Sequence, residues 1–124
     1  GISLMQLERL LSFVGQHCMP DGRTFGWYDE ATWQPLRYES INFYQAVDWV
    51  IKPATYDQRC SLAELLQNRS PRVDVPAAAS ETDTEVDAPR FFVSHWWGIP
   101  VLEAVQCLRA HAHSRGLSRR SGAY

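Results

Sequence analysis

The residues with the greatest chemical capacity lie in one short run, residues 90–100, which reads RFFVSHWWGIP. The imidazole of a histidine can act as an acid, a base or a hydrogen-bond donor near neutral pH. The indole of a tryptophan can stack on another ring, and its N–H is a donor. We therefore predict a ligand-binding site in this run, formed by Ser94, His95, Trp96, Trp97 and Gly98.

Each of these residues also has an interpretation that needs no ligand. Trp96 and Trp97 can be packing anchors, and the His95 imidazole can cap a backbone group. Gly98 suits the tight turn before Pro100, and a lone glycine does not make a phosphate-binding loop. The sequence leaves both interpretations open.

The sequence predicts no catalytic residue. Ser94 and His95 are neighbours, so on a strand their side chains would point to opposite faces and could not form a catalytic pair. Cys60 precedes an expected helix start, where the pKa of a thiol falls, but its place also suits an apolar contact with Leu65.

A metal site is not predicted either. Cys107 and His111 are four residues apart on an expected helix and would share one face. A structural zinc needs four ligands, and the only other such pair is His17 with Cys18, whose adjacency makes them poor co-ligands. We therefore interpret Cys107 as a small core residue and expect no metal and no cofactor in this chain.

The elements expected to position the site are a strand and a helix. Residues 90–97 form a continuous apolar and aromatic run, which is typical of a strand buried on both faces. After Pro100, an apolar stripe at helical spacing predicts a helix, which Gly116 would end. A strand that leads into a helix is the first half of a β-α-β unit, and ligands bind beyond the carboxyl ends of such strands.

The N-terminal region, residues 1–67, is predicted to be helical and rich in aromatic residues. Ser3 with Gln6, and Ser61 with Glu64, match the capping box that begins a helix. Between these helices we expect a small hairpin or an irregular loop packed with aromatic side chains, with its turn near residues 29–32. The aromatic side chains of this region are interpreted as the core of a small subdomain.

A third helix is predicted from residue 41 onward, where apolar side chains recur at helical spacing. We expect Pro53 to close it, because a proline disfavours helical geometry in the residue before it.

Residues 68–89 separate two regions. Proline, alanine, serine, threonine and acidic residues dominate there, and such a segment cannot bury enough surface to offset the entropy of ordering it. We therefore divide the chain into an N-terminal region (1–67), a flexible linker (68–89) and a β-α unit (90–124). The predicted fold class is α/β (or α+β), with the first β-α unit of an open parallel sheet that is incomplete, because no further strand follows.

The motif FVSHWWG and the helix VLEAVQCLRAHAHSRGL that follows it resemble the first strand and helix of a Toll/interleukin-1 receptor-like (TIR-like) domain. The chain is also similar to uncharacterised protist proteins with an FVSHWWG motif and an N-terminal extension. Ile99 stands where those proteins tend to have an acid. The resemblance covers roughly residues 90–117 and implies a role in signalling. In TIR-like enzymes that cleave nicotinamide adenine dinucleotide (NAD), the catalytic glutamate lies on a later helix that these residues do not include.

Composition narrows the classes of partner. The formal net charge is −2, so no global field attracts nucleic acid or an anionic membrane. No apolar run is long enough to span a bilayer, and an odd set of three cysteines favours a reducing, cytoplasmic location.

We expect a signalling or interaction protein with protein partners or self-association, not catalytic by itself. One alternative is that the chain is part of a nucleotide- or NAD-cleaving enzyme, with His95 and Trp96 lining the ligand crevice of the complete parent. Another is that the N-terminal region folds over the edge of the predicted strand, so that the 124 residues form a complete interaction module.

Overall fold

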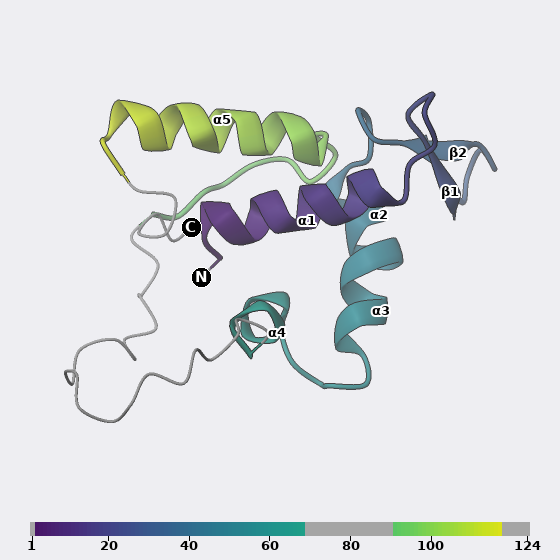
Figure 1. Ribbon diagram of the computed structural model, residues 1–124, viewed down its shortest axis with the longest axis horizontal. Helices are drawn as coiled ribbons and strands as arrows, with labels where there is room; N and C mark the ends of the chain where they lie inside the picture. The colour runs from purple at the N-terminus through teal and green to yellow at the C-terminus, as the bar shows by residue number, and fades with distance from the viewer. Residues whose placement is uncertain (1, 69–90, 118–124) are drawn as a thin grey trace.

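The computed structural model describes residues 2–68 and 91–117. In this part of the chain, helices occur together with a two-stranded antiparallel sheet, so the prediction of a mixed α and β fold is confirmed. Helix α1 (Leu4–Gln16) and helix α5 (Val101–Ser114) lie side by side, although they stand far apart in the sequence (Figure 1). The sheet lies beyond the C-terminal end of α1.

Helix α1 begins as its capping box predicts. The Ser3 Oγ accepts a hydrogen bond from the Gln6 N–H at 3.2 Å, and the Gln6 Oε1 accepts one from the Ser3 N–H at 2.8 Å. These two bonds satisfy donors that have no partner within the helix. The apolar face of α1 is buried, and its aliphatic members are Leu4, Leu7, Leu10, Leu11 and Val14.

Of the two alternatives for the segment between the two capping-box helices, the hairpin is the one present. Strand β1 (Arg23–Tyr28) pairs with strand β2 (Pro35–Arg37), and the connecting turn begins at Asp29. The Asp29 Oδ1 accepts hydrogen bonds from the backbone N–H groups of Ala31 (3.1 Å) and Thr32 (2.9 Å). An aspartate that bonds the backbone two and three residues ahead holds a turn in place.

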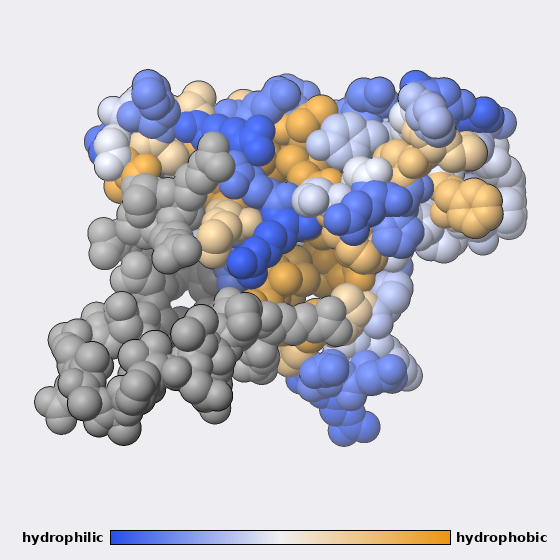
Figure 2. Space-filling model, in the orientation of Figure 1, coloured by the Kyte–Doolittle hydropathy of each residue, from blue (hydrophilic) through white to orange (hydrophobic). Residues whose placement is uncertain are grey.

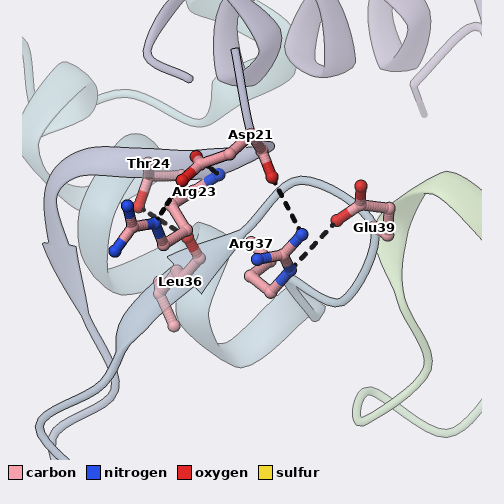
Figure 3. A network of polar contacts seen from close by, with 6 residues as sticks. All are labelled: Asp21, Arg23, Thr24, Leu36, Arg37 and Glu39. Carbon is pink, nitrogen blue, oxygen red and sulfur yellow. Dashed lines mark hydrogen bonds and ion pairs between the residues drawn. The ribbon is translucent and has the colours of Figure 1, made fainter. Parts of the chain in front are cut away.

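Polar contacts close the base of the hairpin (Figure 3). The Asp21 carboxylate pairs with the Arg23 guanidinium at 2.6 Å, and Arg37 donates to the Asp21 carbonyl at 2.9 Å. Arg37 also lies 3.5 Å from the Glu39 carboxylate. These side chains are exposed, so the ion pairs fix the geometry of the loop more than they add stability.

The helix predicted from residue 41 forms, but its predicted end at Pro53 is wrong. Helix α2 (Phe43–Ala46), a π-helical turn η1 (Val47–Ile51) and helix α3 (Lys52–Thr55) follow one another without a break. In the π turn the Lys52 N–H bonds the Val47 carbonyl, five residues back. This wider turn lies directly before Pro53, which lacks an N–H and crowds the carbonyl four residues back. The chain therefore remains helical through the proline.

Helix α4 (Leu62–Asn68) begins at the second capping box, as predicted. The Ser61 Oγ accepts from the Glu64 N–H at 3.3 Å, and the Glu64 carboxylate accepts from the Ser61 N–H at 2.7 Å. The Leu65 side chain of this helix is buried.

Helix α5 ends at a glycine, as predicted. Gly116 adopts a left-handed backbone, with φ of 64°. The Leu117 N–H bonds the Ala112 carbonyl at 2.9 Å, and the Gly116 N–H bonds the His113 carbonyl at 3.1 Å. This is the Schellman arrangement, which satisfies carbonyls at a helix end.

The strand predicted at residues 90–97 is not formed. Residues 91–96 have no regular secondary structure, and Phe92 is 94% exposed instead of buried on both faces. A strand needs a neighbour to pair with its backbone. Within the described residues, β1 and β2 pair with each other and none pairs with this segment, so the predicted β-α unit lacks its strand. We call residues 91–97 the strap.

Side chains from both sides of the predicted linker share one core. Val101 and Val105 of α5 are fully buried in the same cluster as the leucines of α1. Arg109 of α5 also pairs with Glu8 of α1 at 2.7 Å. Residues 69–89 of the predicted linker lie outside the described residues, so the division into regions stays a prediction.

Candidate functional site

An apolar groove with a volume of about 950 Å³ lies between the strap and the two long helices. One wall consists of Ile2 and Leu7 at the start of α1, and another of Ala104, Cys107 and Leu108 on α5. Phe43, at the start of α2, and Ile99 also line it, and the strap supplies the rest. Its volume is that of a ligand-binding cleft.

The end of the strap is fixed where it meets α2. The Phe43 N–H donates to the Trp97 carbonyl at 3.1 Å, and the Val101 N–H donates to the Ile41 carbonyl at 2.9 Å. The Phe43 N–H is a free donor in the first turn of a helix, so the strap supplies an acceptor that the helix lacks. These bonds anchor the strap at its C-terminal end.

Two of the five predicted site residues line the groove, namely Ser94 and His95. The His95 ring meets the Phe43 ring edge to face, with centroids 4.7 Å apart. The imidazole is exposed at this wall, where it can donate or accept a hydrogen bond from a bound molecule. Its role in binding stays a prediction.

The other three predicted residues lie outside the groove lining. Trp96 is 76% exposed, and its indole covers Gly98 so closely that a Cβ at this glycine would collide with it. The Trp97 ring contacts the Tyr44 ring, with centroids 5.6 Å apart. Trp97 and Gly98 thus have packing partners, whereas Trp96 presents most of its surface to solvent.

Several groove residues were not predicted from the sequence. Cys107 was interpreted as a core residue, but it is exposed and lines the groove. Leu7 and Phe43 come from elements that only the fold brings beside the strap. The apolar stripe of α5 is the one local signal, since Ala104 and Leu108 belong to it and contribute to the groove wall.

The groove is suited to binding apolar surfaces. No Asp, Glu, Lys or Arg is found among the described residues that line it, and its polar groups are Ser94, His95 and the Cys107 thiol. Apolar side chains also reach the surface beside α1, on the side of α3 and α4 (Figure 2). A cleft of this kind gains affinity by removing apolar surface from water.

Nucleophilic and metal chemistry gain no support from the cysteines and histidines. Burial raises the pKa of the Cys18 thiol, with a smaller contribution from the Glu39 charge. The thiol donates to the Val14 carbonyl at 3.2 Å and is therefore not an activated nucleophile. Within residues 2–68 and 91–117, no three His, Cys, Asp or Glu side chains gather as metal ligands would.

Two further findings bear on the class of protein. No helix in the described part is both long and apolar enough to cross a membrane. No protein-family model matches the chain, and no curated protein or solved structure matches it. The resemblance to TIR-like domains therefore stays a prediction.

Proposed function

We propose that this chain is a protein-interaction module of a cytoplasmic signalling protein, and that its groove binds an apolar segment of a partner protein. The observation that carries the proposal is the groove itself, with aromatic side chains exposed along the strap that borders it.

The exposed aromatic side chains favour a protein as the partner. Phe92 is 94% exposed, and Trp96 and Trp97 are 76% and 47% exposed. Burying one such side chain contributes about 1.5–3 kcal/mol. Aromatic residues are enriched in the central, water-free part of protein interfaces. A monomer that leaves these aromatic side chains exposed beside a groove therefore gains free energy when a partner buries them.

The few polar groups of the groove favour a partner that is apolar but has a backbone to bind. Ser94 and His95 lie on the strap and can bond backbone groups of an incoming segment. A strongly charged segment would lose water without gaining an opposite charge, because the described residues of the lining include no Asp, Glu, Lys or Arg. An amphipathic helix supplies the apolar face, and the unpaired backbone groups at its end can bond Ser94 and His95.

The resemblance of residues 90–117 to a TIR-like domain supports signalling as the setting of this interaction. The proposal does not depend on it, because the groove is defined by residues on both sides of the predicted linker. NAD cleavage by a complete parent protein stays a prediction: it needs a glutamate beyond these residues, and Trp96 does not line the groove beside His95.

The thiol of Cys107 provides the test, because it is exposed and lines the groove. We would follow its reaction with an aromatic disulfide reagent in a variant that carries Cys18→Ser and Cys60→Ser. The probe is a synthetic amphipathic peptide with leucines at positions i, i+3, i+4 and i+7. We expect the peptide to slow the reaction of Cys107 in a saturable manner.

The matched control is a peptide of the same composition with its leucines scrambled, so that no apolar face forms. This control should leave the reaction rate unchanged. An equal rate with and without the amphipathic peptide, at concentrations that saturate a weak interface, would refute the proposed function.

A further inference from the structure

We infer that the partner is a second copy of this chain, and that Phe92 of each copy enters the groove of the other. The inference rests on the proposed function and names the occupant of the same groove. A twofold arrangement requires one surface that carries both a protruding group and the recess that receives it. The strap and the groove provide both.

The protruding group and the recess are adjacent. Phe92 lines the rim of the groove, yet 94% of its surface is exposed, so its ring projects outward and does not fill the groove of its own chain. Ser94 and His95 follow on the same strap and also line the groove. When two copies meet face to face at their straps, each Phe92 therefore lies near the groove of the other copy.

The exposed area agrees with a stable dimer. Aromatic side chains each present roughly 150–250 Å². We multiply this area by the exposed fraction of each of four side chains, namely Phe92, Trp96, Trp97 and Tyr44, the last of which is 55% exposed. Together these side chains expose roughly 600 Å² to water. A stable interface buries about 800 Å² per partner, and the apolar walls of the groove supply the remainder.

Charge does not oppose this association. The formal net charge of each copy is only −2, so two copies repel each other weakly. Among residues 2–68 and 91–117, those that line the groove include no Asp, Glu, Lys or Arg, so these residues bring no like charges together where the ring enters. A separate partner with a strongly basic or acidic segment would find no complementary charge there.

The first experiment measures the mass of the full chain by sedimentation over a range of concentrations. We expect a monomer–dimer equilibrium, and Phe92→Ser should raise its dissociation constant by at least about thirtyfold, the effect of losing a central aromatic contact. The matched control is Phe25→Ser, since Phe25 is 78% exposed on β1 and does not line the groove. This control should leave the dissociation constant unchanged.

A second experiment tests whether ring and groove meet between copies. Ala104→Phe places a ring in the groove wall and should weaken the dimer as much as Phe92→Ser does. In a mixture of the two variants, the Phe92 ring of the Ala104→Phe chain can enter the open groove of the Phe92→Ser chain. We expect a heterodimer that is tighter than either variant alone and weaker than the original dimer. If Ala104→Phe does not fold, alkylation of Cys107 fills the same groove.

The outcomes separate this inference from the proposed function. If the chain is monomeric at every concentration but the amphipathic peptide still protects Cys107, the partner is not a second copy. The proposed interaction module is then retained. A dimer that Phe92→Ser does not weaken also overturns the inference. A monomer in which the peptide fails to protect Cys107 overturns both.

Discussion

At the scale of single residues, Asp29 joins the hairpin to the helix that carries Phe43. Its Oδ1 accepts from the Thr32 N–H at 2.9 Å, and its Oδ2 accepts from the Gln45 side chain at 2.8 Å. The backbone hydrogen bond from Thr32 lowers the pKa of Asp29 most, followed by the hydrogen bond from Gln45. One carboxylate thus positions the start of α2, to which the strap is bonded.

The lowered pKa predicts how stability depends on pH. A carboxyl group whose folded pKa lies below its unfolded pKa stabilises the protein above the unfolded value, and this contribution disappears as the pH falls through the folded value. We therefore expect the urea midpoint to fall between neutral pH and about pH 3, near which carboxylates protonate. Asp29→Asn should reduce this fall, although Asp21 and Glu64, whose pKa values are also lowered, will retain part of it. An equal pH dependence in the variant would contradict this role of Asp29.

Alanine substitutions at two glycines should change the free energy of unfolding in opposite directions. Gly116 has a positive φ, so Gly116→Ala should destabilise the protein by roughly 1 kcal/mol. Gly15 lies inside α1, where a Cβ would meet Tyr38 at an ordinary 3.6 Å. Gly15→Ala should therefore stabilise by roughly 0.5 kcal/mol, because alanine loses less backbone entropy in a helix. Urea unfolding of both variants checks this, and effects of the same sign would contradict it.

At the scale of elements, the helices could be predicted because their signals are local. The capping residues Ser3 and Ser61 and the end at Gly116 act within a few residues of the chain, and each forms as expected. The turn at Asp29 is local in the same sense. The helix end predicted at Pro53 was wrong because a wider π turn precedes the proline, which lacks an N–H, and the helix continues past it. That turn leaves no clear signal in the sequence.

The strap could not be predicted from its own residues. An apolar run fits a buried strand only when another strand pairs with it, and pairing is a property of the whole fold. Here the run is bonded to the start of α2 instead, through the Trp97 carbonyl. The same apolar residues that suggested burial therefore lie exposed beside the groove.

The shared core of α1 and α5 predicts that residues on both sides of the predicted linker unfold together. Val105→Ala should destabilise the protein by about 2 kcal/mol, because its side chain is fully buried. Val93→Ala is the matched control, since Val93 is 40% exposed on the strap, and it should change stability little. Both variants should unfold in one transition when followed by tryptophan fluorescence. Two transitions, with only one sensitive to Val105→Ala, would show that α1 and α5 do not share a cooperative core.

At the scale of the whole molecule, the site is a product of packing. The sequence identified Ser94 and His95 from residue type, but the groove that they line also needs Leu7 and Phe43. Those two residues are ordinary apolar positions until the fold places them opposite α5. Chemistry-bearing residues can thus be predicted locally, whereas a recess made by four segments of the chain cannot.

Hydrogen exchange of the strap tests the interaction module most directly. At the lowest protein concentration that the measurement allows, the backbone amides of residues 92–95 should exchange rapidly, while those of α1 and α5 exchange slowly. Adding the amphipathic peptide should slow exchange on the strap and leave the hairpin unchanged. Exchange on the strap that stays equally fast at saturating peptide would contradict the account.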